Sequence, residues 1–220
     1  MRKIAFLVLG FAALGQLAAA QPDPPVTSAQ VDDEGLVAVK VKGLDHVYAL
    51  PGANLRGYDK VMLDPVEVSF SKSWKPDLAG GPVTAAERQT IRSGLAKIVR
   101  EELQKELQRS GRYTLVSTPD ADVLRIRAEI RDLYINAPNL PRSGPTRTYA
   151  LSVGQMRLVA ELRDAPTGGL IARVIDFKKD PDAPWLHFTS RLDNVAAARR
   201  AAADWAHILR EQLDAAHTLK

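Results

Sequence analysis

Four histidines are the side chains best suited to acid–base or metal chemistry near neutral pH, and their spacing decides whether they act together. They are His46, His187, His207 and His217, in segments that read as a strand, a loop and a helix. Only His207 and His217 share a segment, and the ten residues of helix between them span about 15 Å, too far to bind one ion. We therefore expect no metal site, and solvated or capping roles for these imidazoles.

Two carboxylates, Asp64 and Glu67, are close enough in sequence for acid and base work, but the chain supplies little else for it. A change of strand phase between them leaves their relative direction open, and no nucleophile is evident beside them. The glycines at 80–81 precede a helix, but Pro82 removes a backbone donor there, which favours helix punctuation over a phosphate site. No catalytic or cofactor-binding motif occurs, so we expect no catalytic residue, no cofactor and no enzyme. An enzyme whose site assembles only in three dimensions stays open as an alternative.

Arginines dominate the outward positions of three predicted strands. They are Arg125, Arg127, Arg131, Arg157, Arg163 and Arg173. Because they outnumber Glu129 and Glu161 on the same face, the strands could present an arginine-rich patch to an anionic lipid head group or an acidic protein surface. The alternative is a solvated face on which arginines pair with glutamates across strands. The candidate interaction residues of this face are Arg125, Arg127, Arg157 and Arg163.

Aromatic residues mark three irregular segments, at 71–83, 136–152 and 178–189. Irregular segments of this length inside a domain are uncommon and often bind a partner, and tryptophan and tyrosine are favoured interface anchors. The candidate anchors are Trp74, Tyr149, Trp185 and Phe188. We predict that they contact another protein. The alternative for Trp74 and Trp185 is that each folds back over the edge of the core.

Strands must position most of these side chains. Alternating apolar residues predict short strands at 37–41, 46–50 and 113–116, and longer ones at 122–135, 153–164 and 170–178. The last two are joined by a turn at 165–169 and form a hairpin. From 58 to 70 the apolar phase changes at Asp64-Pro65, which predicts a bent strand with a bulge, at an edge or irregular position.

Two amphipathic helices complete the pattern. Thr84 and Glu87 form a capping box ahead of a long apolar stripe that ends at Gly111. A final helix opens at Thr189 or Ser190 and carries an alanine-rich apolar stripe. Since a sheet with one apolar face must cover that face, the sequence predicts an α+β two-layer sandwich, mostly antiparallel, with both helices on one side.

The first twenty residues have the composition of a secretory signal. Arg2 and Lys3 precede an apolar stretch at 4–17 and a small-residue cleavage site, so we expect cleavage after Ala20 and export to the periplasm, with no transmembrane anchor left. Residues 21–34 contain three prolines and read as a disordered leader. Residues 35–217 are then expected to form one domain.

Composition narrows the classes further. The chain has 30 lysines and arginines against 26 aspartates and glutamates, a balance that gives no strong field for nucleic acid, which we exclude as a partner. It has no cysteine, which excludes thiol catalysis, thiolate metal sites and disulfides. Stability must therefore come from packing.

Several runs of residues carry a family resemblance: VYALPGA at 47–53, YDKVMLDPVEV at 58–68, LVAELRD at 158–164, and shorter runs at 70–74, 132–138 and 147–149. With these runs the chain resembles the bacterial family called domain of unknown function 3313, whose members are usually described as envelope lipoproteins. The resemblance implies an envelope location and transfers no activity, substrate or catalytic residue. Without cysteine, this chain departs from the members that are lipidated on an N-terminal cysteine.

Together these observations predict a periplasmic, non-catalytic accessory or binding domain that contacts another envelope protein. An alternative is a lipid or small-molecule carrier with a pocket between helices and sheet, because apolar residues occur in both phases of the strand at 170–178. A copurified ligand would separate the carrier from the adaptor.

Overall fold

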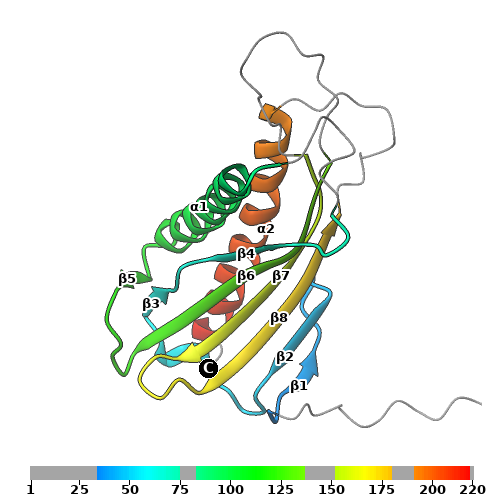
Figure 1. Cartoon of the computed structure of the whole chain (residues 1–220). Helices are drawn as coiled ribbons and strands as arrows, with labels where there is room; N and C mark the ends of the chain where they lie inside the picture. Colours follow the sequence, from blue (N-terminus) through cyan, green and yellow to red (C-terminus); the bar gives the residue numbers. More distant parts are fainter. Residues whose placement is uncertain (1–33, 75–82, 137–151, 180–190, 219–220) are drawn as a thin grey trace, which may run out of the picture.

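A computed structural model of the chain describes residues 34–74, 83–136, 152–179 and 191–218 (Figure 1). The signal, and all but the last residue of the leader, lie outside these ranges. The strands are β1 (Val37–Val39), β2 (His46–Ala49), β3 (Lys60–Leu63), β4 (Glu67–Phe70), β5 (Thr114–Val116), β6 (Val123–Asn136), β7 (Ser152–Asp164) and β8 (Leu170–Lys179). The helices are η1 (Leu55–Gly57, a 3₁₀ turn), α1 (Ala85–Arg109) and α2 (Arg191–Thr218).

The eight strands form one mixed sheet in the order β1-β2-β8-β7-β6-β3-β5, with β4 also paired to β6. Strands β6, β7, β8, β2 and β1 pair antiparallel, as alternation and the short turn at 165–169 predict. Strands β3 and β4 run parallel to β6, and β5 runs parallel to β3. The predicted α+β class with a mostly antiparallel sheet is confirmed.

The bent strand predicted at 58–70 is instead two strands, β3 and β4, which pair with successive parts of β6. Pro65 lies between them and lacks a backbone N–H, so the ladder stops there. The last backbone bond before it joins Asp64 N–H to the carbonyl of Ile126 at 3.0 Å. An irregularity lies in β6 as well, where Asp132 has a φ of 54° and the register with β7 shifts.

Helix α1 begins where the sequence predicts. Thr84 Oγ1 accepts the backbone N–H of Glu87 at 3.2 Å, and Glu87 Oε2 accepts the backbone N–H of Thr84 at 2.7 Å. This reciprocal pair satisfies donors that would otherwise be unpaired at the first turn. The helix ends before Gly111, whose φ of 68° is the left-handed conformation that glycine adopts without strain.

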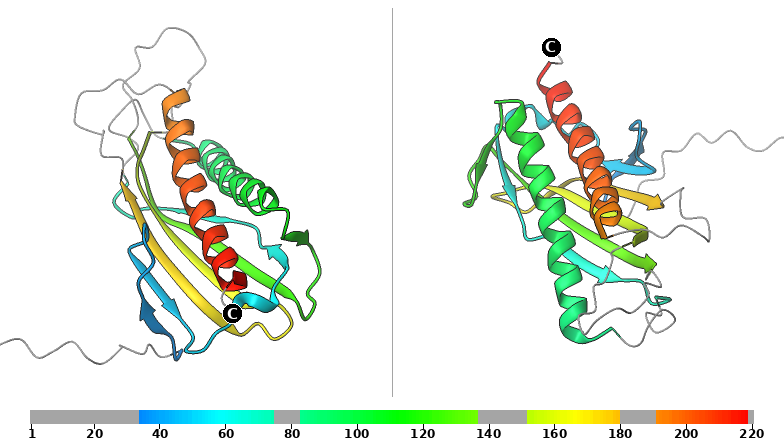
Figure 2. Two further views of the ribbon diagram at one scale, coloured as in Figure 1. Left: turned by 180° about the vertical axis from the view of Figure 1, so that it is seen from behind. Right: turned by 90° about the horizontal axis from the view of Figure 1, so that it is seen from above.

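Helices α1 and α2 pack against each other and cover the same face of the sheet (Figure 2). Their apolar stripes bury side chains against it: Ile91, Leu95, Val99 and Leu103 from α1, and Ala198, Ala202, Trp205 and Leu213 from α2. The sheet contributes the alternate residues of β6 and β7, such as Ile130 and Leu158. None of the helices in the described ranges is long and apolar enough to cross a bilayer.

Candidate functional site

Five alanines face each other between the sheet and α2. They are Ala49, Ala128, Ala160, Ala172 and Ala202. On adjacent strands Ala128 is paired with Ala160, and Ala49 with Ala172. A methyl group is the shortest apolar side chain, so these positions do not fill the space beneath the helix.

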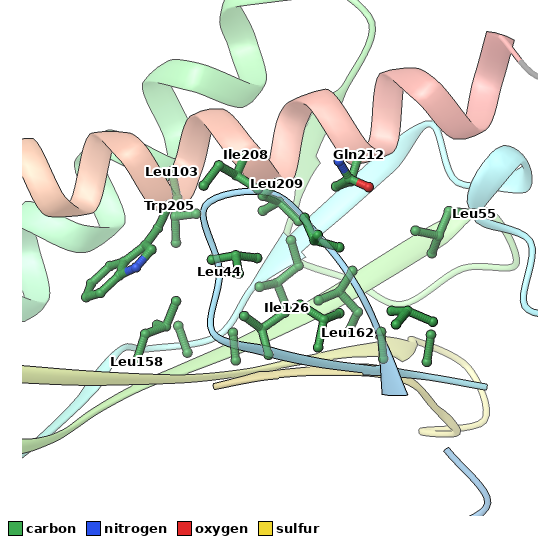
Figure 3. Close-up of a pocket in the computed structure, with 18 of the residues that line it drawn as sticks. Leu44, Leu55, Leu103, Ile126, Leu158, Leu162, Trp205, Ile208, Leu209 and Gln212 are labelled. Atoms are coloured by element: carbon green, nitrogen blue, oxygen red, sulfur yellow. The ribbon is translucent and has the colours of Figure 1, made fainter. Parts of the chain in front are cut away.

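The result is an apolar cavity of about 190 Å³ between the sheet, helix α2 and the β1–β2 loop (Figure 3). Its larger wall residues include Leu44, Leu103, Ile126, Leu158, Leu162 and Trp205. Protein interiors are packed about as densely as organic crystals, with few voids larger than a water molecule. A cavity of this size is therefore a distinct feature of the fold.

One end of the cavity is deeply buried and the other is open. Trp205, 4% exposed, and the buried Leu158 lie at the closed end, and Figure 3 places Leu55 at the opposite end. Among the lining residues, Val39 is 39% exposed and Gln212 is also exposed. The opening therefore lies between β1 and the C-terminal half of α2.

A buried carboxylate stands beside the closed end. Asp176 is 1% exposed, and its Oδ2 accepts the indole Nε1–H of Trp205 at 2.7 Å. Lys178 Nζ lies 3.1 Å from the same oxygen. The Asp176 Oδ1 accepts the backbone N–H of Asp45 at 3.0 Å, and the Asp45 carboxylate accepts the backbone N–H of Phe177 at 2.8 Å. These bonds tie α2, β8 and the β1–β2 loop together.

The β1–β2 loop closes over the cavity at a glycine. Gly43 has a φ of 88°, and a Cβ added there would lie 3.0 Å from Cδ1 of Ile208 on α2. Both the backbone conformation and the close approach to the helix favour glycine at this position. Leu44 follows it and projects into the cavity wall (Figure 3).

The predicted arginine face is the side of the sheet opposite the helices, and its arginines lie in ion pairs. Arg125 Nε is 2.9 Å from Asp64. Arg127 pairs with Glu67 and Glu129, Arg157 with Asp132, and Arg163 with Glu161. An anionic ligand would have to compete with these carboxylates for each guanidinium, which is the arrangement expected of a solvated charged face.

Trp74 turns back onto the core. Its indole Nε1–H donates to the carbonyl of Ile135 at 2.9 Å, and its ring stacks on Phe70 with centroids 4.2 Å apart. The guanidinium of Arg92 lies over the Phe70 ring, 5.3 Å from its centroid. The predicted anchors Tyr149, Trp185 and Phe188 lie outside the described residues.

The two carboxylates considered for acid–base chemistry lie in separate ion pairs, Asp64 with Arg125 and Glu67 with Arg127. His207 and His217 lie on α2 and contact different acids, Glu106 and Asp59. In the part of the chain that the structure describes, no three metal-ligating side chains gather in one place. His187 lies outside that part.

Among the carboxyl groups in the described ranges, Glu106 has the most strongly lowered pKa. Its Oε1 lies 3.0 Å from His207 Nδ1 and accepts from Arg210 Nε at 2.9 Å. These hydrogen bonds, that of His207 first, lower the pKa of Glu106 to about 2. These bonds join Glu106 of α1 to two residues of α2, and Glu106 does not line the cavity.

The sequence predicted a pocket between helices and sheet as an alternative, and of the β8 residues on which that alternative rested, Ala172 and Val174 line the cavity. Trp205 and Ala202 were expected on the apolar stripe of the last helix, and the alanines of the strands were counted as core positions. The available signal was that inward positions at 128, 160 and 172 are all alanine. Adjacent small residues on a buried face predict either close helix approach or a void.

The chain belongs to the protein family of unknown function DUF3313, whose model matches residues 28–209. No curated protein sequence matches the chain.

Several solved structures are similar at low level. PelC of Paraburkholderia phytofirmans, crystallised as a dodecamer, is 13% identical, with 74% of this chain and 95% of PelC covered and a TM-score of 0.36. A Xanthomonas campestris protein is 10% identical, with coverages of 76% and 93% and a TM-score of 0.43. A minor lipoprotein of Acinetobacter baumannii is 13% identical, with coverages of 72% and 94% and a TM-score of 0.37. Likeness at this level carries no argument about function.

Proposed function

We propose that this protein is a non-catalytic binding protein of the bacterial periplasm that holds a small apolar ligand or a lipid chain in the cavity beneath α2. The observation that carries the proposal is the cavity of about 190 Å³, walled almost entirely by apolar side chains. An engineered apolar cavity of about 150 Å³ is known to stay dry and to bind benzene or xenon. The volume here accepts a ligand of that size or slightly larger.

The energetics favour occupancy. At the cost of about 24 cal/mol per Å³ measured for closed core cavities, an empty cavity of about 190 Å³ costs at most on the order of 4–5 kcal/mol, because water enters the open end of this one. An apolar ligand restores the missing dispersion contacts and removes its own apolar surface from water. Such a cost is large beside the net stability of a protein, so filling the cavity with a ligand would stabilise the fold.

The test is a calorimetric titration of the purified chain with n-octanol. We expect saturable binding at one site with a negative change in heat capacity, together with a higher melting temperature. Octanol has an uncharged head, so attraction to the arginine face does not contribute. An absence of saturable heat and of any change in melting temperature, up to the solubility of octanol, would contradict the proposal.

The contact with another envelope protein stays a prediction. Its anchors were Trp74, which is packed against the core, and three aromatics that lie outside the described residues. A bound lipid and a protein partner are compatible functions, since the open end of the cavity is at the molecular surface.

A further inference from the structure

A buried, charged carboxylate holds the residue at the closed end of the cavity in place. Asp176 lies on the helix-facing side of β8, and its fully buried carboxylate accepts from the indole of Trp205 and the backbone of Asp45. Lys178 supplies the neighbouring positive charge at 3.1 Å. A buried ion pair is costly compared with apolar residues of the same volume, so it contributes little net stability by itself.

What the Asp176 carboxylate does provide is a fixed orientation of the Trp205 ring. The indole has a single N–H donor, so a 2.7 Å bond to Asp176 fixes the orientation of the whole ring. The ring is thereby held across the end of the cavity, beside Leu158 (Figure 3). An apolar residue at 176 would remove the hydrogen bond that orients the ring and leave its orientation to packing alone.

The cavity is also elongated. Its α2 wall runs from Ala202 and Trp205 to Leu209 and Gln212, a rise of about 15 Å along the helix. The lining residues are thus spread along one direction, between the buried end and the open end. The exposed end carries the polar Gln212, whereas the buried end offers only apolar surface to a ligand.

From this shape we propose that the cavity takes one linear hydrocarbon chain, with its methyl end against Trp205 and its polar head at Gln212. Trp205, positioned by Asp176, then sets the longest chain that fits. This inference rests on the proposed function and adds the ligand class and the residue that determines its length.

The experiment measures the affinities of n-alcohols from hexanol to tetradecanol for the wild-type chain and for variants. Each added methylene should strengthen binding by about fourfold until the chain reaches the closed end, after which affinity stops rising. In Trp205→Leu the limit should move to longer alcohols. In Leu158→Phe, which narrows the same end, it should move to shorter ones.

Two controls separate the outcomes. Leu55→Ala enlarges the opposite end and should leave unchanged the alcohol length at which affinity stops rising. Asp176→Asn weakens the hydrogen bond that orients the ring, and should make affinity level off more gradually with alcohol length without abolishing binding. If the wild-type chain binds no alcohol, the proposed function fails. If it binds them but a folded Trp205→Leu or Leu158→Phe variant keeps the wild-type limit, only the role of Trp205 is overturned. Because the two substitutions change volume in opposite directions, failure of one to fold leaves the other as the test.

Discussion

Ala128 and Ala160 lie directly opposite each other on β6 and β7, and both are buried on the face that α2 covers. Two methyl groups thus occupy a place where larger side chains would fill the interface between the layers. This pair accounts for the middle of the cavity, and it makes the cavity simple to fill by mutation.

Ala160→Leu should place additional carbon atoms in the cavity. We expect the free energy of unfolding to rise by about 1–2 kcal/mol and n-octanol affinity to fall at least tenfold, because the side chain occupies the ligand's place. Urea denaturation and calorimetry measure the two effects. The matched control is Ala38→Leu, on an exposed position of β1, which should change neither. A destabilised Ala160→Leu with unchanged octanol affinity would mean that the site lies elsewhere.

Trp74 is expected to contribute to stability, because it packs on Phe70 and donates to the Ile135 carbonyl. Trp74→Phe keeps a ring but loses the donor, and should cost about 1 kcal/mol. Trp74→Ala loses both and should cost about 2–3 kcal/mol. The measurement is chemical denaturation of both variants. A neutral Trp74→Ala would instead favour the earlier expectation of a free interface anchor.

The arginine face should tolerate single substitutions. Arg127 and Arg157 are both about half exposed and paired with carboxylates, so Arg127→Ser and Arg157→Ser should each change stability by less than about 1 kcal/mol. We also expect both variants to sediment with phosphatidylglycerol vesicles to the same extent as the wild type at about 0.15 M salt. Reduced sedimentation of either variant would restore the patch as a lipid-binding surface.

The lowered pKa of Glu106 predicts that the stability of the fold falls in acid. His207 and Arg210 hold its pKa at about 2, below the ordinary value of 4.5. A carboxyl whose folded-state pKa is depressed stabilises the fold above its unfolded pKa, and that contribution disappears as pH falls from about 4.5 to about 2. The free energy of unfolding of the wild type should therefore be higher than that of Glu106→Gln by on the order of 2–3 kcal/mol at pH 7. This difference should close near pH 2.

Denaturation of both proteins between pH 2 and pH 7 measures this gap. Glu101→Gln on the same helix is the control, since Glu101 is much more exposed and its salt-bridge contacts are looser, at 3.6–3.7 Å. A gap between wild type and Glu106→Gln that stays constant over the pH range would contradict the assigned role of the carboxylate.

Local signals in the sequence were sufficient for much of the fold. The Thr84–Glu87 capping box, the alternation along β6 and β7 and the turn at 165–169 each depend on neighbouring residues, and the structure has all three. The parallel pairing of β3 and β4 with β6 joins residues about sixty positions apart, which periodicity within one segment does not encode.

The candidate site was harder for the same reason. Ala128, Ala160 and Ala172 come from three strands, and only the register places Ala128 opposite Ala160 and Ala172 diagonally from Ala160. Trp205 gives no sign in sequence that its indole meets Asp176, since twenty-nine positions separate them. Exposed-looking aromatics were weighed by residue type alone, and Trp74 shows that the backbone carbonyl within reach decides where such a ring goes.

The order in which the strands find their partners has a consequence for how the chain acquires its fold. Among the described strands, β1 and β2 are the one pair in which both strands precede α1 in the sequence. Strand β2 also pairs with β8, and β3 and β4 pair with β6, so these partners come after α1. Apart from the β1–β2 pair and the pairing of β3 with β5, the strands that precede α1 therefore have no sheet partner until the β6–β7–β8 meander exists. Folding should begin in that meander, be slow for a protein of this size because of its many distant contacts, and leave a fragment ending at residue 110 without stable structure.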